Sequence, residues 1–171
     1  MVRIIGIDPG SRITGYGIVD TNGSKHKYVT SGFITIKADT LGDKLGMIFV
    51  EVGRIVSDWT PESMAIEQVF VKHNVDSALK LGQARGAAIC AAVQANLPIG
   101  EYTPRAIKKA VVGSGAADKQ QIQHMIQRLL GLDAVPQNDE ADALAIAICH
   151  AHHIKIRKSG VAAGVRRGRW V

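Results

Sequence analysis

The stretch VRIIGIDPGSRITGYGIVD, residues 2–20, decides the fold. Residues 2–8 form a short apolar run that ends in Asp8, which is typical of a central strand. The Pro-Gly-Ser-Arg segment at 9–12 has turn chemistry, and a second apolar run at 13–20 then returns along the first. A hairpin as the first connection excludes a doubly wound nucleotide fold, in which a helix follows the first strand.

Strand and helix patterns alternate beyond this hairpin. Further strands are predicted over 26–36, 63–68 and 97–102. Helices are predicted over 40–58, 77–95, 104–112 and 118–130, and from about residue 139 onward. Hairpin strands followed by alternating helices and strands predict an α/β fold, a mixed five-stranded sheet flanked by helices on both faces.

Length and composition bound the class of protein. The chain has 171 residues, of which 46% are apolar, and this is enough for one domain with a substantial core. No run of 18 apolar residues and no signal-peptide pattern occurs, so we expect a cytoplasmic protein that does not bind a membrane. Two distant cysteines, Cys90 and Cys149, give no disulfide framework.

The charge of the chain is unevenly distributed. The formal net charge is +6, yet residues 1–153 carry 15 Lys and Arg against 15 Asp and Glu. The excess lies in residues 154–171, which hold six basic residues and no acid. We therefore predict a folded domain over 1–153 and a basic, disordered tail over 154–171. Such a tail either scans a polyanion or only aids solubility, and composition does not separate the two.

Two motifs resemble functional sites but do not fit them. Residues 10–15 have the glycine spacing of a P-loop, but Tyr16 and Gly17 stand where Lys and Ser or Thr are required. A cluster near the end of the last helix has metal-ligand residue types: Cys149, His150, His152 and His153. Adjacent histidines at a helix end diverge in direction, so we expect a solvent-facing cluster and not a zinc site.

Four carboxylates stand at the ends of apolar segments. Asp8 ends the first strand and Glu67 ends the fourth, while Asp139 and Asp142 share one face of the last helix. Glu140 points about 100° away, so we expect it to face solvent and cap the helix. Taken singly, each acid has a structural interpretation, but together they favour a metal site.

The chemistry of such a site follows from its charge. If the first and fourth strands are neighbours, the four acids converge, and like charges that close are costly unless cations neutralise them. Oxygen ligands select hard ions such as Mg²⁺ or Mn²⁺. Two such ions, about 4 Å apart, support in-line attack of water on a phosphodiester.

Four segments of the chain resemble the RuvC crossover junction endodeoxyribonucleases, which are Holliday junction resolvases. The matching motifs are GIDPGSRITGYGIV (6–19), AIEQVF (65–70), DSALKLGQARG (76–86) and QNDEADALAIA (137–147). The resemblance runs from residue 3 to about 150 and implies a ribonuclease H-like fold. It also implies a homodimer that uses Mg²⁺ to place paired symmetric nicks in four-way DNA junctions during recombination and repair. Family members work with the branch-migration proteins RuvA and RuvB.

The resemblance also implies roles for individual residues. It assigns the catalytic, metal-binding carboxylates to Asp8, Glu67, Asp139 and Asp142. It assigns DNA contacts to Phe70, Lys108 and Lys119. The aromatic ring would stack on an unpaired base, with core packing as the alternative. The lysines would pair with phosphates or stabilise transition-state charge. Two metal ions would activate the attacking water and stabilise the departing 3′ oxygen, leaving 5′-phosphate and 3′-hydroxyl ends. Helix 77–95 is expected to supply part of the dimer interface, and a buried intramolecular helix is the alternative.

Two other functions share part of the pattern. An actin-like or sugar-kinase-type ATPase also opens with a glycine-containing hairpin, but such folds need two such domains and 171 residues supply one. A non-catalytic junction-binding protein would need the basic tail and Phe70 but not four convergent acids.

Overall fold

The computed structural model describes residues 1–69 and 75–158, and side chains as far as Ile154. Within these ranges the strands are β1 (Val2–Asp8), β2 (Ile13–Thr21), β3 (His26–Thr35), β4 (Ser63–Glu67) and β5 (Ile99–Tyr102). The helices are α1 (Leu41–Trp59), α2 (Val75–Gln94), α3 (Pro104–Val112), α4 (Lys119–Leu130) and α5 (Asn138–Lys158). Every predicted element is therefore present, with its predicted ends within two residues of those observed.

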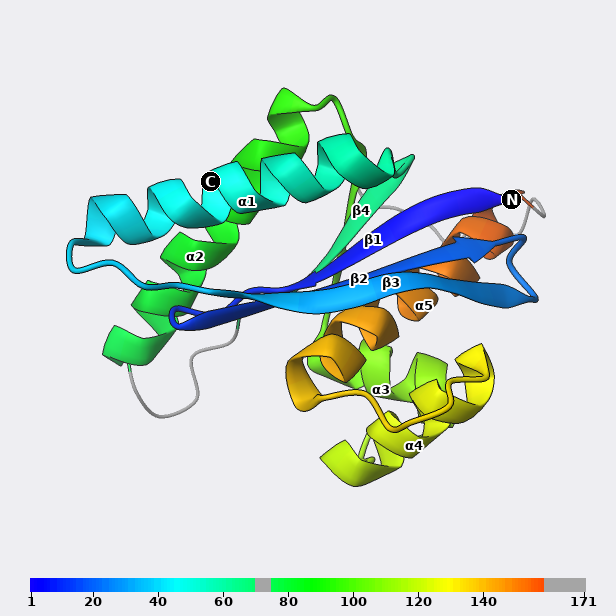
Figure 1. Cartoon of the computed structure of the whole chain (residues 1–171). Helices are drawn as coiled ribbons and strands as arrows, with labels where there is room; N and C mark the ends of the chain where they lie inside the picture. Colours follow the sequence, from blue (N-terminus) through cyan, green and yellow to red (C-terminus); the bar gives the residue numbers. More distant parts are fainter. Residues whose placement is uncertain (70–74, 159–171) are drawn as a thin grey trace.

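The strands form one mixed sheet in the order β3-β2-β1-β4-β5 (Figure 1). The pairs β1–β2 and β2–β3 are antiparallel, which confirms the predicted opening hairpin. The pairs β1–β4 and β4–β5 are parallel, and α2 is the crossover connection from β4 to β5. Strand β1 is the central strand of the sheet. Because β1 and β4 are parallel neighbours, their carboxyl ends lie side by side.

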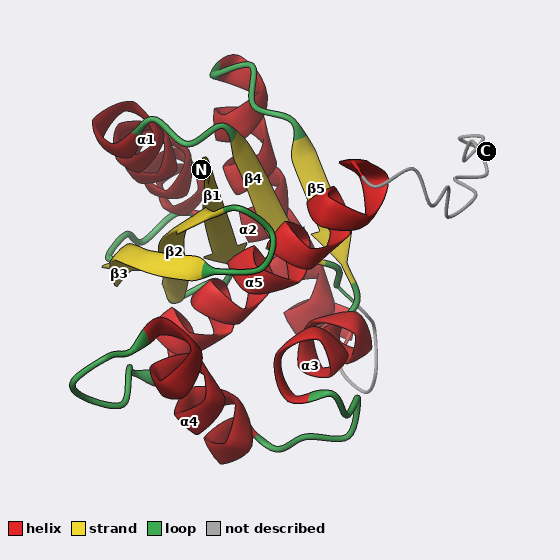
Figure 2. Ribbon diagram, turned by 90° about the vertical axis from the view of Figure 1, so that its right-hand side faces the viewer, coloured by secondary structure: helices red, strands yellow, loops and turns green. Residues whose placement is uncertain are grey.

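Helices cover both faces of the sheet, as predicted. Helices α1 and α2 lie on one face, while α5, backed by α3 and α4, lies on the other (Figures 1 and 2). The alternation of β1 divides the core accordingly: Ile5 and Ile7 pack toward α1 and α2, and Ile4 packs toward α5. Among the described residues, no helix is long and apolar enough to cross a membrane.

Helix α5 packs with its backbone directly on the central strands. A Cβ atom added at Gly6 would lie 2.1 Å from the carbonyl oxygen of Ala143, and one at Gly17 would lie 2.7 Å from Cγ of Leu144. Gly6 and Gly17 are opposite each other in the β1–β2 register. The glycines in the opening stretch therefore create the shallow track in which α5 lies.

The histidines near the end of α5 do not form the solvent-facing cluster that we expected. His150 is buried, with Nδ1 2.7 Å from the Tyr102 hydroxyl and Nε2 3.1 Å from Oγ of Ser63. Nδ1 of His153 donates to the carbonyl oxygen of Cys149 at 2.8 Å. The rings diverge as predicted, but His150 faces the sheet because the apolar face of α5 continues past it.

Two further predictions concern the end of α5 and the cysteines. The helix continues to Lys158, beyond residue 153 where we expected the domain to end, and residues 159–171 lie outside the described residues. Both Cys90 and Cys149 are free thiols, which confirms that no disulfide framework is present.

Candidate active site

Asp8 and Glu67 lie side by side at one edge of the sheet. Strands β1 and β4 are parallel neighbours, and Ile7 pairs with Ile66, so the two residues that follow stand next to each other. Ile4 of β1 and Ala65 of β4 pack toward α5. Because side chains alternate along a strand, Asp8 lies on the same face of β1 as Ile4, and Glu67 lies on the same face of β4 as Ala65. Strand pairing therefore brings together two carboxylates that are distant in the sequence, on the side covered by α5.

The first turn of α5 is held against the same place. Gly15 of β2 is the register partner of Asp8. A Cβ atom at Gly15 would lie only 2.2 Å from the carbonyl oxygen of Asp139. The backbone at Asp139 in the first turn of α5 thus lies against β2, next to Asp8. Asp142 follows one helical turn later.

Glu140 caps α5, as predicted. Its Oε2 accepts a hydrogen bond from the backbone N–H of Gln137 at 3.2 Å, as a third-position glutamate does in a capping box. It is not solvent-facing, however, because it is half-buried and its Oε1 accepts from the Ser31 hydroxyl at 3.3 Å. Glu140 therefore ties the helix start to β3 instead of joining the other acids.

The other three predicted acids are close enough to Asp8 to change its pKa. Burial, followed by the neighbouring charges of Asp142, Glu67 and Asp139, raises the pKa of Asp8 to about 8. Burial is also the main cause that raises the pKa of Asp142, with Lys119 opposing it. An aspartate beside three other carboxylates is the expected arrangement of a cation site, because a bound cation removes the repulsion.

The donor set fits a hard divalent cation. All four side chains offer carboxylate oxygens, which suit Mg²⁺ or Mn²⁺ and not a soft metal. Among the described residues, no three His, Cys, Asp or Glu side chains stand in an arrangement that would already hold an ion. Mutual repulsion between carboxylates disfavours a closed ligand set until a cation is bound.

Two predicted basic residues lie beside the acids. Nζ of Lys119, the first residue of α4, is 3.8 Å from Oδ2 of Asp142, and its side chain is 72% exposed. Nζ of Lys108 in α3 donates to the carbonyl oxygen of Ala117 at 2.8 Å and is close enough to lower the pKa of Asp142. Helices α3 and α4 thus bring positive charge to one side of the carboxylates. Phe70, the third predicted contact, lies outside the described residues.

Sequence reasoning missed three residues that support the site. Thr14 is fully buried, and its hydroxyl accepts from the N–H of Gly10 at 3.3 Å and donates to the carbonyl of Gly10 at 3.1 Å, which fixes the turn after Asp8. Nε of Arg85 donates to the backbone carbonyl of Glu67 at 2.9 Å. Gly15 provides the close approach of α5. Alternate glycines in the second strand were the available signal, because a strand glycine often marks close backbone contact.

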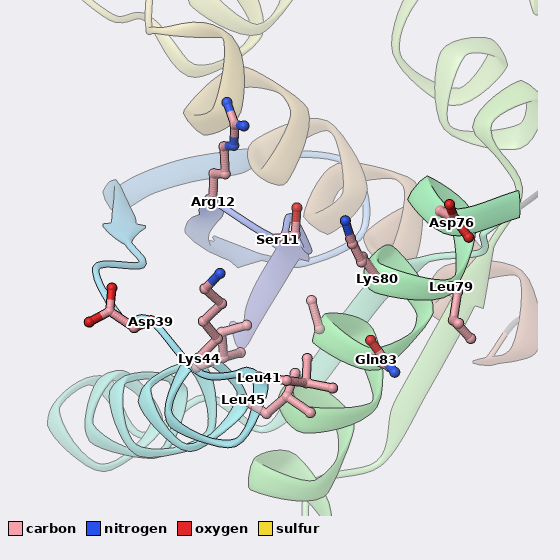
Figure 3. A pocket seen from close by; sticks show the side chains of 12 residues that line it. Ser11, Arg12, Asp39, Leu41, Lys44, Leu45, Asp76, Leu79, Lys80 and Gln83 are labelled. Carbon is pink, nitrogen blue, oxygen red and sulfur yellow. The ribbon is translucent and has the colours of Figure 1, made fainter. Parts of the chain in front are cut away.

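A cleft of about 600 Å³ flanks the turn that follows Asp8 (Figure 3). Its apolar lining includes Leu41 and Leu45 of α1, which lie between α1 and α2. Its charged lining consists of three basic residues, Arg12 of the turn, Lys44 of α1 and Lys80 of α2, and two acids, Asp39 and Asp76. The cleft therefore combines an apolar floor with a small excess of basic residues, on the α1 and α2 side of the sheet.

The raised pKa of Asp8 predicts how stability depends on pH in EDTA. The folded protein holds this proton up to about pH 8, whereas the unfolded chain releases it near pH 3.8. Stability therefore falls as pH rises through this window. We expect Asp8→Asn to flatten that fall and to raise the melting temperature at pH 8 by about 2–5 °C. Calorimetry of both proteins from pH 4 to 8 measures this, and parallel profiles would contradict it.

Comparisons with known proteins agree with this architecture. The family model described as crossover junction endodeoxyribonuclease RuvC matches residues 4–150. The RuvC proteins of Tolumonas auensis and Aliivibrio salmonicida are 53% and 54% identical to the chain, over 99% of each sequence. The structure of T. thermophilus RuvC in complex with Holliday junction substrate superposes with a TM-score of 0.86 at 31% identity, covering 92% of this chain and 97% of that one. The yeast mitochondrial Holliday junction resolvase shares the fold, with a TM-score of 0.66 at 12% identity.

Proposed function

This chain belongs to the RuvC family of crossover junction endodeoxyribonucleases, and we propose that Asp8, Glu67, Asp139 and Asp142 are the groups with which it cuts Holliday junctions. Membership of the family implies an endonuclease with a ribonuclease H-like fold that depends on a divalent metal. The observation that carries the assignment is the half-buried Asp8 at the end of the central strand, whose pKa burial and three neighbouring acids raise to about 8.

We propose Mg²⁺ as the metal, with Mn²⁺ as a substitute and two ions for each active site. The four carboxylates would hold the ions, and when bound they supply the Lewis-acid stabilisation for in-line displacement at phosphorus. Asp8 would be the central ligand of this set, because it ends the central strand between Glu67 and the start of α5. Protonated Asp8 must lose its proton on binding, so metal binding releases protons near neutral pH.

The chain's own residues position the scissile strand. Lys119, largely exposed and 3.8 Å from Asp142, is placed to donate to a phosphate oxygen beside the acids. Lys108 adds positive charge while its bond to Ala117 orders the loop before α4. We propose that Arg12, Lys44 and Lys80 extend this DNA surface along the flanking cleft (Figure 3). Phe70 remains the proposed stacking residue.

We further propose that two copies of the chain pair through α2. Its outward side carries small and apolar residues at coiled-coil spacing: Val75, Leu79, Gly82, Gly86, Cys90 and Val93. Val75, Leu79 and Val93 are 70%, 60% and 59% exposed. A Cβ atom at Gly82 or Gly86 would meet nothing within 4 Å, so packing inside one protomer does not require these glycines. A second α2, related by a two-fold axis, would fill this face and place two active sites on one symmetric junction.

Gly86→Arg is expected to weaken dimerisation by about 100-fold or more, because it places a long charged side chain on the contact face. Gly53→Arg on α1 is the matched control, since Gly53 also faces open space but lies on the other helix. Sedimentation equilibrium of the two variants measures the difference. Equal association of both variants and the wild type would remove α2 from the interface.

The proposed products are two symmetric nicks with 5′-phosphate and 3′-hydroxyl ends. We also propose RuvA and RuvB as partners and the cytoplasm as the location, on the family resemblance.

The test of the proposed function is cleavage of a synthetic four-way junction with a movable centre, in Mg²⁺ and in EDTA. Both cut sites are mapped, and the nicks are treated with ligase. We expect symmetric, ligatable nicks in Mg²⁺ only, and no cutting of a duplex of the same sequence. Junction binding without cutting would favour the non-catalytic alternative, and ATP hydrolysis would favour the ATPase.

A further inference from the structure

Two histidines far from the carboxylates meet across the fold. Nε2 of His26, at the start of β3, lies 3.3 Å from Nε2 of His152, near the end of α5. The ring centroids are 5.3 Å apart and the ring planes are tilted by 51°. Both rings are half-buried, and they join segments separated by 126 residues. The pair thus connects the β2–β3 hairpin to α5.

Thr21 fixes which nitrogen of His26 carries the proton. The Thr21 hydroxyl accepts from the backbone N–H of Gly23 at 2.9 Å and donates to the carbonyl of Lys25 at 3.2 Å. Nδ1 of His26 lies 2.9 Å from the same oxygen. Because the hydroxyl proton is directed to Lys25, Nδ1–H of His26 is the donor in this contact, and Nε2 keeps its lone pair toward His152. A second hydrogen bond of this kind is what orients metal-binding imidazoles.

The spacing of the two nitrogens matches a tetrahedral metal site. Zn–N bonds of about 2.0–2.1 Å at the tetrahedral angle place two nitrogens about 3.3–3.4 Å apart. We propose that His26 and His152 form a two-imidazole site for a borderline divalent transition-metal ion, with Zn²⁺ as its representative. The ion would clip the β2–β3 hairpin to the end of α5, and water would fill its other positions.

The surroundings of His26 suit such an ion. His26 lines a groove of about 620 Å³, which provides an entry path and room for bound water. Burial lowers the pKa of His26, and His152 lowers it further, so this ring is neutral and able to bind at pH 7. No third His, Cys, Asp or Glu completes the set within the described residues, which implies an exchangeable ion. Nitrogen donors also separate this site from the carboxylates, because Mg²⁺ prefers oxygen.

The alternative is a plain N–H···N hydrogen bond between the rings, and Zn²⁺ titration distinguishes the two. The titration is made on the full-length protein in excess Mg²⁺, which occupies the carboxylates, and is followed by melting temperature and by imidazole ¹⁵N NMR. We expect saturating Zn²⁺ to raise the melting temperature by about 5 °C and to shift the ¹⁵N signals of two histidines. His26→Gln is expected to lose both effects.

Two further variants make the test specific. Thr21→Val keeps both rings but removes the acceptor of Nδ1–H, so we expect Zn²⁺ affinity to fall by about 10–100-fold. His124→Gln removes an exposed histidine on α4 and is expected to bind Zn²⁺ like the wild type. Unshifted imidazole signals in the wild type, or unchanged Zn²⁺ affinity in both His26→Gln and Thr21→Val, would overturn the site.

Discussion

Replacing Asp8 by Asn is expected to slow junction cleavage by about 10⁴-fold or more, while junction affinity stays within a few-fold of the wild type. The amide keeps the size of the side chain and the end of β1, but it removes the charge that would hold the cations. It adds no negative charge facing DNA, so binding has no reason to weaken. Single-turnover cleavage and gel-shift titration of one labelled junction measure the two quantities separately.

Glu140→Gln is the matched control for this substitution. Glu140 follows the predicted ligand Asp139, but its carboxylate bonds to Gln137 and Ser31. A glutamine can keep the acceptor oxygen of the cap. We therefore expect cleavage near the wild-type rate. A wild-type rate in Asp8→Asn, or an equal loss in both variants, would contradict the assignment of Asp8.

Gly15→Ala is expected to lower the cleavage rate by about 100-fold, because a misplacement of about 1 Å in a reacting group costs that much. The added Cβ would lie 2.2 Å from the carbonyl oxygen of Asp139, a contact that backbone movement alone can relieve. The first turn of α5 must then move away from β2 and carry Asp139 and Asp142 away from Asp8. Cleavage kinetics with saturating Mg²⁺ measure the loss.

Gly46→Ala separates this effect from the general effect of adding a methyl group. Gly46 lies in α1, and a Cβ atom there would meet nothing within 4 Å. Alanine favours a helix over glycine, so we expect unchanged cleavage and a gain in stability of about 0.5–1 kcal/mol. If Gly15→Ala cleaves as fast as Gly46→Ala, the close approach of α5 does not position the acids.

The fold was largely readable from the sequence because its local signals agree with one another. The turn at 9–12 between two apolar runs predicts the hairpin. Thr103 followed by a proline predicts the start of α3, and in the structure the Thr103 hydroxyl accepts a hydrogen bond from the N–H of Ala106. The position of Asp8 at a strand end was likewise predictable. That it faces α5 beside Glu67 required the register of the parallel pair, which no local pattern encodes.

The parts that were not predictable depend on long-range packing. His150 was expected to belong to a solvent-facing cluster because adjacent histidines at a helix end diverge in direction, but Ser63 and Tyr102 satisfy its ring within the fold. Arg85 has no local signal for its bond to the backbone of Glu67. These contacts join segments through side-chain geometry that strand and helix periodicity does not describe.

The most direct test of the central claim is a Mn²⁺ titration of the junction-bound protein, in which electron paramagnetic resonance counts the free ion. If the four acids form the metal centre, the wild type binds two Mn²⁺ ions per protomer, and Glu140→Gln does the same. Asp8→Asn then loses this binding. Equal Mn²⁺ stoichiometry and affinity in Asp8→Asn and the wild type would contradict the account.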